Sequence, residues 1–229
     1  MTNTAQQLVF ELPHRPALEL EDFLVSASNA AAVALVDRWP DWPVGAAILC
    51  GPAGCGKSHL ANVWRLRSQA HMLHSAALES ANVPSLAAHR ALVIEDVGAT
   101  ADEAALFHLL NIVREQRLAM LLTCAIAPGE LALRLPDLKS RLKALPLAII
   151  SPPDDALLRA VLVKLFADRQ LSVDPQIIAY LIVRMERSMD AARRIVSEID
   201  RLALVQQRAV TRAVAAAALQ SLGFEGKSF

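Results

Sequence analysis

The sequence is poor in aromatic residues and glycine, and it has no excess of charge of either sign. Aromatic side chains make up 4% of the 229 residues, eight residues are glycine, and 23 Lys and Arg balance 23 Asp and Glu. Zero net charge removes the electrostatic attraction by which many proteins hold DNA phosphates, which argues against non-specific nucleic-acid binding. Apolar residues make up 54% of the chain, enough for a full core, so intrinsic disorder is excluded as a class.

Cysteine and long apolar runs are also scarce. The three cysteines, Cys50, Cys55 and Cys124, have neither C-x-x-C pairing nor zinc-ligand spacing, and three cannot all pair within one chain. A reducing compartment fits this usage best. The longest apolar stretch, residues 118–127, is shorter than the ~20 residues of a membrane span, and no basic start precedes an apolar block. We therefore expect a soluble, unprocessed, cytoplasmic protein.

The first 150 residues alternate short apolar runs with helical segments. Continuous apolar runs are typical of strands buried on both faces, and helices between them imply parallel crossovers. The fold class is therefore predicted as α/β, with a doubly wound, five-stranded parallel sheet. The predicted strands are residues 46–50, 71–75, 91–95, 119–125 and 145–150, and the helices among them are 29–39, 57–68 and 102–117.

Beyond Pro152 and Pro153 the sequence has only helical periodicity, with apolar residues three or four apart. Asp154, Asp174 and Thr211 are candidate N-caps. We expect three parts: an N-terminal arm (1–16), an α/β domain (17–151) and a helical lid (152–229). The predicted lid helices are residues 154–169, 175–187, 190–208 and 212–222.

The segment from Gly51 to Ser58 fits the phosphate-loop pattern G-x-x-x-x-G-K-[ST], between an apolar strand and a helix. Glycines let backbone N–H groups turn toward an anion, the helix N-terminus adds partial positive charge, and Lys57 adds a full charge. Ser58 is the candidate Mg²⁺ ligand. The alternative is a glycine-rich turn with a chance lysine. The expected nucleotide contacts here are Gly51, Pro52, Ala53, Gly54, Cys55, Gly56, Lys57, Ser58 and His59.

A second acidic feature is the apolar strand that ends in Glu95 and Asp96, as a Walker B strand does. Either carboxylate is expected to reach Mg²⁺, directly or through water, and Asp96 is the candidate catalytic acid. Walker B strands usually place Asp first and a longer acid second, and Glu95-Asp96 reverses this order. The usual position of the metal and the usual activation of water therefore do not carry over directly to this strand. The alternative is a strand that merely ends at a polar surface.

Together these motifs resemble an AAA+ module, and more closely the nucleotide-binding module of the replication initiator DnaA. The resemblance covers roughly residues 18–205. Glu21-Asp22-Phe23-Leu24-Val25 resembles the segment that closes over the base, and Leu138-Lys139-Ser140-Arg141-Leu142 resembles the arginine-finger box. The likeness implies base contacts from Phe23, Leu24 and Val25.

Within that family the chain is similar to the Hda-type regulators, because no basic helix-turn-helix reader follows the module in this sequence. This likeness implies two partners, DnaA and the DNA-loaded sliding clamp. It also implies that the protein is associated with the nucleoid or replisome and that a homo-oligomer is possible. It implies that Arg141 acts in trans, as an arginine finger toward ATP held by DnaA. The alternative for Arg141 is a solvated basic helix face over residues 137–143.

The N-terminal arm holds Gln7-Leu8-Val9-Phe10-Glu11-Leu12, which resembles the short motif by which proteins dock on the bacterial sliding clamp. The apolar side chains would enter a pocket and Gln7 would bond to its rim. The alternative is that the segment folds back as an edge strand. The expected clamp contacts are Gln7, Leu8, Phe10 and Leu12.

The lid arginine of AAA+ modules, sensor II, aligns with Asp190, so Arg187, Arg193 or Arg194 must replace it if any residue does. Sensor I is expected at Thr123 or Cys124. The family implies ADP or ATP with Mg²⁺. The reversed acids at Glu95 and Asp96 and the missing sensor II arginine predict that the nucleotide is bound well and hydrolysed slowly if at all. Competing functions are an autonomous P-loop ATPase (a loader or remodelling motor) and an initiator that binds DNA.

Overall fold

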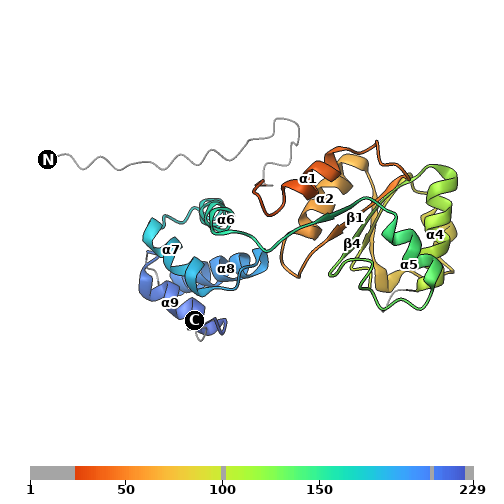
Figure 1. Ribbon diagram of the computed structural model, residues 1–229. Coiled ribbons are helices and arrows are strands. Elements are labelled where there is room, and N and C mark those ends of the chain that lie inside the picture. The colour runs from red at the N-terminus through yellow and green to blue at the C-terminus, as the bar shows by residue number, and fades with distance from the viewer. Residues whose placement is uncertain (1–23, 99–101, 207–208, 225–229) are drawn as a thin grey trace.

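The computed structural model describes residues 24–98, 102–206 and 209–224. The predicted clamp-binding motif and Phe23 lie outside these residues. The described chain has an α/β part and a helical part, joined after the last strand (Figure 1). No helix among the described residues has the length and apolarity that crossing a membrane requires.

Five parallel strands form one sheet in the order β2-β3-β4-β1-β5. All five residues of β1 are buried, and β1 pairs with both β4 and β5. All strands are parallel and β4 lies between β1 and β3, so the phosphate loop after β1 and the acids at the end of β3 lie at one edge of the sheet, a strand apart. The strands are β1 (Ala46–Cys50), β2 (His71–His74), β3 (Ala91–Glu95), β4 (Ala119–Cys124) and β5 (Leu147–Ile149).

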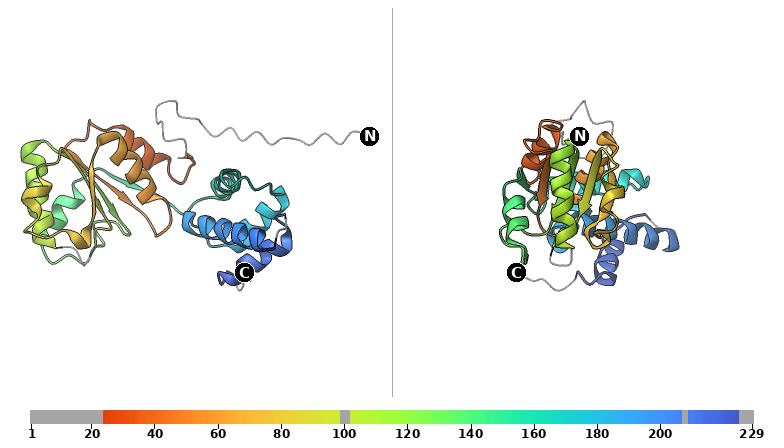
Figure 2. Two further views of the ribbon diagram at one scale, coloured as in Figure 1. Left: turned by 180° about the vertical axis from the view of Figure 1, so that it is seen from behind. Right: turned by 90° about the vertical axis from the view of Figure 1, so that its right-hand side faces the viewer.

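Helices cover both faces of the sheet (Figure 2). One face packs against α1 (Ala30–Asp37) and α2 (Lys57–Ser68), and Trp64 of α2 is fully buried there. The other face packs against α3 (Val83–Leu86), α4 (Glu103–Gln116) and α5 (Pro136–Lys143). This is the doubly wound layer that buried apolar strands require.

The helical part, called the lid below, has its own apolar cluster. Asp154, Asp174 and Thr211 accept hydrogen bonds from the backbone N–H groups of the first turns of α6, α7 and α9, which confirms the three predicted N-caps. The lid helices are α6 (Asp155–Asp168), α7 (Pro175–Arg184), α8 (Met189–Gln206) and α9 (Arg212–Ser221).

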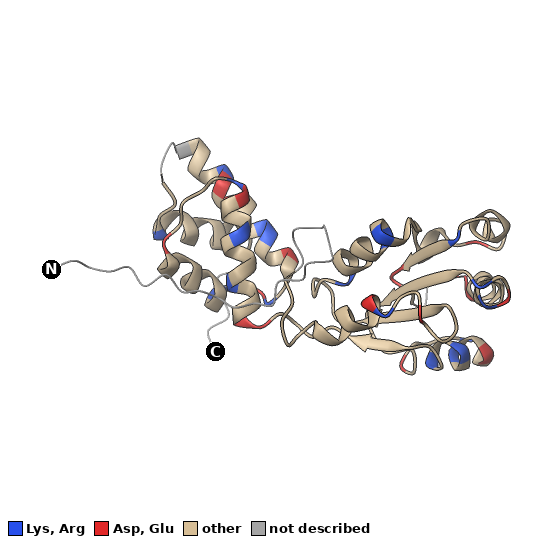
Figure 3. Cartoon of the chain, turned by 90° about the horizontal axis from the view of Figure 1, so that it is seen from above, with Lys and Arg blue, Asp and Glu red and all other residues tan. Residues whose placement is uncertain are grey.

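Most predicted elements agree with the structure to within a few residues. The largest difference among the strands is β5, expected over 145–150 and observed over Leu147–Ile149, because it is an edge strand with one pairing partner. The short helix α3 was not predicted, since a single turn has too few residues for a periodic pattern. Acidic and basic side chains are interspersed over both parts (Figure 3).

Candidate nucleotide-binding site

The phosphate loop joins β1 to α2 at the carboxyl edge of the sheet. Gly51 has a φ of 157°, and a Cβ there would lie 2.2 Å from the carbonyl oxygen of Ile150. The Gly51 N–H donates to the carbonyl of Cys124 at 3.2 Å. Close approach of the neighbouring strands therefore requires glycine where the loop begins.

Lys57 points back into the loop from the first turn of α2. It is 6% exposed, and its ammonium donates to the carbonyl oxygens of Gly51 at 2.7 Å and Pro52 at 2.9 Å. A buried cation next to a helix N-terminus favours an anion at this position. This geometry favours a phosphate-binding loop over a glycine-rich turn with a chance lysine.

The lid contacts the phosphate loop directly at Gly54. The Met189 N–H donates to the Gly54 carbonyl at 2.7 Å, and a Cβ on Gly54 would lie 2.7 Å from the Cβ of Ser188. Ser188 is buried, and its hydroxyl accepts a hydrogen bond from the Ala191 N–H at 3.0 Å, which helps to start α8. The close approach at this contact leaves no space for a side chain at Gly54.

A cleft of about 220 Å³ opens between the phosphate loop and the lid. Leu24 and Gly56 line it from the α/β part, whereas Val161 and Leu165 of α6 line it from the lid. An apolar wall beside a phosphate loop suits a base next to its phosphates. The other lining residues are Asn29, Cys55, His59, Leu157, Lys164, Asp168, Met189 and Arg193.

The remaining predicted residues around the loop lie in different surroundings. Cys55 is buried, and burial raises the pKa of its thiol, which keeps it neutral beside the phosphate position. Val25 packs against the apolar cluster of α1 and α2 and does not line the cleft. Ser58 is exposed in the first turn of α2, whereas Pro52 and Ala53 are exposed at the tip of the loop.

The two acids at the end of β3 have different surroundings, Glu95 as the last residue of the strand and Asp96 directly after it. Oε1 of Glu95 is buried and has no hydrogen-bond partner among the described residues. Asp96 is 58% exposed at its side chain and has a φ of 54°, which turns the chain out of the strand. A buried carboxylate oxygen without a partner is costly and suits a cation ligand.

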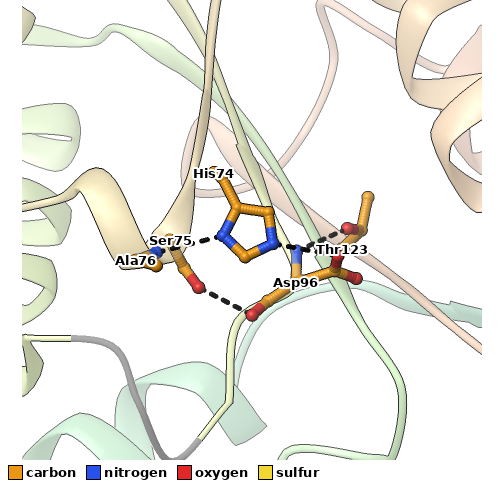
Figure 4. A network of polar contacts seen from close by, with 5 residues as sticks. All are labelled: His74, Ser75, Ala76, Asp96 and Thr123. Carbon is orange, nitrogen blue, oxygen red and sulfur yellow. Dashed lines mark hydrogen bonds and ion pairs between the residues drawn. The ribbon is translucent and has the colours of Figure 1, made fainter.

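Asp96 belongs to a hydrogen-bonded network that joins three strand ends (Figure 4). Its carboxylate lies 3.2 Å from Nε2 of His74, and its carbonyl accepts from the Ser75 hydroxyl at 2.7 Å. Its N–H donates to the Thr123 hydroxyl at 3.0 Å. Both the backbone and the side chain of Asp96 therefore have protein partners.

The donor set fits Mg²⁺ in the manner of nucleotide enzymes, where one or two protein oxygens complete a shell made mostly by water and phosphates. Ser58 and Glu95 supply such oxygens, and Glu95 Oε1 is otherwise without a partner in the described chain. The described residues contain no group of three His, Cys, Asp or Glu side chains arranged to hold a metal by themselves.

Both candidates for sensor I are buried at the end of β4. The Thr123 hydroxyl accepts a hydrogen bond from the Asp96 N–H, and the Thr123 carbonyl accepts one from the Val97 N–H at 2.8 Å. The Cys124 thiol points to the carbonyl of Leu49 at 3.8 Å, and burial raises its pKa. Thr123 thus links β4 to the acidic strand end.

The three candidate lid arginines lie in different surroundings. Arg187 pairs with Asp155 at 2.8 Å, and Arg194 stacks over Phe224 with its guanidinium carbon 5.7 Å from the ring centroid. Arg193 lines the cleft, three residues after Asp190 on α8. Asp190 is exposed, with its Cβ 3.7 Å from a Cβ built on Gly54.

Arg141 lies on α5, which packs with α4 on the face of the sheet opposite α1 and α2, and α5 is well separated from the lid (Figure 1). It is half-buried, with its guanidinium carbon 4.7 Å from the centroid of the Phe107 ring of α4. The Lys139 ammonium donates a hydrogen bond to the carbonyl of Leu131 at 2.9 Å, whereas Lys143 is exposed. The aromatic ring gives Arg141 a defined position that a merely solvated basic face would lack.

Sequence reasoning missed His74 and the contact of Ser188 and Met189 with the loop. His71, the other histidine of β2, stacks on His89, with the two ring centroids 4.5 Å apart. The available signal for His74 was a polar residue at the end of a predicted strand, whereas the pairing that brings it beside Asp96 appears only in the structure. The contact of Ser188 with Gly54 had no sequence signal, since the two residues lie far apart in the chain.

Comparisons with known proteins agree with this architecture. No protein-family model and no curated protein matches the chain. Domain III of the Thermotoga maritima replication initiation protein DnaA is similar, at 17% identity and a TM-score of 0.77, over 91% of this chain and 98% of that one. AMPPCP-bound DnaA from Aquifex aeolicus is similar at 15% identity and a TM-score of 0.64, over 93% of both chains.

The Thermotoga maritima RuvB Holliday junction branch migration motor is similar at 14% identity and a TM-score of 0.63. The match covers 77% of this chain and 61% of RuvB, so this chain spans less than two thirds of that motor. At these identities the likeness establishes the fold alone, an α/β part followed by a helical lid as in DnaA domain III.

Proposed function

We propose that this chain is a DnaA-related nucleotide-binding regulator. It holds a nucleotide in its own cleft and presents Arg141 to ATP bound by the initiator DnaA, and so represses re-initiation of replication. The observation that supports this most directly is the placement of Arg141 on a ring of α4, far from the lid that closes the chain's own cleft. An arginine in that place serves a neighbouring molecule better than its own site.

The chain's own nucleotide is ADP or ATP in this proposal, because the DnaA of a similar structure is AMPPCP-bound. Backbone N–H groups of the loop and Lys57 hold the phosphates, while Leu24, Val161 and Leu165 cover the base. Arg193 brings the positive charge that the lid lacks at Asp190. Mg²⁺, when bound, neutralises phosphate charge, and Ser58 and Glu95 are the residues that would hold it.

Slow hydrolysis by the chain itself follows from the same geometry. Asp96 would have to accept a proton from an attacking water, but its carboxylate has His74 as a partner. Asp190 adds negative charge beside the loop, where AAA+ modules place an arginine. The nucleotide then serves mainly to hold the loop and the lid together.

DnaA and the DNA-loaded sliding clamp are the proposed partners. The clamp would bind Gln7, Leu8, Phe10 and Leu12, and DnaA would meet the surface around α5. Clamp tethering raises the effective concentration of Arg141 at DnaA, so that weak direct contacts suffice. Location at the replisome or nucleoid follows from these partners.

The test is DnaA-dependent ATP hydrolysis with clamp loaded on DNA. We expect Arg141→Ala to lower the stimulated rate by about 10³-fold, in the range of arginine fingers, while clamp binding stays intact. Lys143→Ala, an exposed cation two residues away on the same helix, is the matched control and should change the rate less than twofold. Full stimulation by Arg141→Ala would remove this residue from the mechanism.

The alternative function is an autonomous P-loop ATPase, such as a loader or a remodelling motor. The similarity of the fold to the RuvB motor supports this alternative. It requires sustained phosphate release by the chain alone, which the regulator does not. Release at several turnovers per second without DnaA, and no gain when DnaA and loaded clamp are added, would establish the ATPase instead.

A further inference from the structure

The lid has a cavity of about 720 Å³ at its surface, called the lid hollow below. It is formed where α7 ends, where the chain enters α8 and where it leaves α9, and these helices lie together in the lid (Figure 1). None of the residues that line it also lines the nucleotide-binding cleft. A cavity of this size has room for several side chains of a bound molecule.

Part of the wall of the lid hollow is apolar. Val183, in the last turn of α7, is 73% exposed, and Leu222 and Phe224 line the hollow after α9 with half-buried side chains. Apolar surface that faces water favours burial against another apolar group. An occupant with an apolar side chain would therefore gain free energy by covering Val183.

The charged residues of the lid hollow are three arginines and two acids. Arg187 pairs with Asp155 at 2.8 Å, and Glu186 is exposed. Within the part of the chain that the structure describes, neither Arg184 nor Arg194 forms an ion pair with a carboxylate. The hollow therefore has an excess of positive charge, carried by two guanidinium groups that can accept an acidic partner.

Aromatic rings hold both of these guanidinium groups in place. The guanidinium carbon of Arg184 lies 4.0 Å from the centroid of the Tyr180 ring, and that of Arg194 lies 5.7 Å from the centroid of the Phe224 ring. Arg184 also donates to the Tyr180 carbonyl at 3.3 Å. Stacking uses the flat face of the guanidinium and leaves N–H groups at its edge. Such an edge matches a carboxylate, which can accept two parallel hydrogen bonds.

We propose that the lid hollow is a docking site for an acidic segment of a partner protein. Carboxylates of that segment pair with Arg184 and Arg194, and a neighbouring apolar side chain covers Val183. This goes beyond the proposed function, which assigns its partners to α5 and to the N-terminal arm. A nucleic acid fits less well, because its backbone has a charge at every nucleotide and this chain has no net positive charge.

The test begins with a display library of random short peptides, selected on the immobilised full chain. We expect the recovered peptides to share at least two Asp or Glu residues close to a Leu, Ile, Val or Phe. One recovered peptide, labelled with fluorescein, is then titrated with the chain and followed by anisotropy. The double variant Arg184→Gln with Arg194→Gln should weaken its binding about 20-fold, because two charge-assisted pairs are lost.

Two controls separate docking from folding. Arg114→Gln changes an exposed arginine of α4, outside the lid hollow, and should bind the peptide within twofold of the parent. Arg194→Glu should bind the recovered peptide weakly, but it should regain affinity for a version in which one acid is replaced by arginine. An unfolded lid would show no such regain.

Three results would overturn the inference. One is a set of recovered peptides with no enrichment of acidic residues. Another is equal binding of the peptide by the parent and by the double variant. The third is tighter binding of an oligothymidine strand than of any recovered peptide, lost in the double variant, which would assign the lid hollow to nucleic acid.

Discussion

The α/β part and the lid meet at one cleft but contribute to it in different ways. The α/β part fixes the phosphate loop through buried strands, with Lys57 held by two loop carbonyls. The lid reaches the loop through the start of α8 and lines the cleft with side chains of amphipathic helices. The comparison shows that buried strands fix the candidate phosphate loop, whereas the contact of the loop with the lid joins two separate apolar cores.

The largest effect should come from the α/β side. We expect Lys57→Met to lower ADP affinity about 100-fold, because a buried ammonium that can bond to phosphate oxygens is removed. Titration with a fluorescent ADP analogue measures it. Arg65→Met, on the same helix but bonded to Asn62 at 2.9 Å, is the control and should bind normally. Equal affinities for both variants would mean that the loop is not the phosphate site.

A smaller effect is expected from the lid side. Arg193→Ala should lower ADP affinity about three- to tenfold, since an exposed guanidinium at the cleft gains less from phosphates than a buried cation does. Arg194→Ala is the matched control, because that neighbour stacks over Phe224. The same titration applies. A loss in Arg194→Ala as large as in Arg193→Ala would assign the effect to lid stability.

The smallest effect concerns the lid alone. Glu198 accepts two hydrogen bonds from Arg201 and one from Ser221, which links α8 to the end of α9. These bonds lower the pKa of Glu198 to about 2 from its ordinary 4.5. We expect Glu198→Gln to lower the free energy of unfolding of the lid by ~0.5–1 kcal/mol at pH 7.

The pH dependence of that effect has a definite sign. A carboxyl with a depressed pKa in the folded state stabilises fully above its unfolded pKa. The contribution of Glu198 is therefore complete above about pH 4.5 and is lost as the pH falls toward 2. Urea unfolding at pH 7, 4 and 3 should show the difference between parent and Glu198→Gln shrinking. A constant difference across this range would contradict the assignment.

Much of the fold was predictable from local pattern. The strands β1 and β3 and the helix α2 have the predicted bounds, because continuous apolar runs and a glycine-rich loop leave few alternatives. The N-caps of α6, α7 and α9 were predicted because a side-chain oxygen at the start of a periodic segment acts locally. Strand order was not predictable, since pairing joins residues far apart in the chain.

The candidate site was predictable only in part. The sequence singled out Lys57, Glu95 and Asp96, but it left open which of the two acids reaches Mg²⁺. The structure separates them, since Glu95 has a buried oxygen without a partner in the described chain while Asp96 is bound by His74. It also separates the lid arginines, of which Arg193 lines the cleft. Which partner a side chain meets depends on neighbours that local pattern does not specify.

The sequence by itself determined the α/β class, the phosphate loop and the lid helices, because period, glycine spacing and caps act over a few residues. Only the tertiary structure decided that Gly54 meets Ser188, that His74 faces Asp96, and that Arg141 lies on Phe107. Those contacts arise from the order of the strands and from the packing of two cores, and burial of apolar surface selects both over the whole chain.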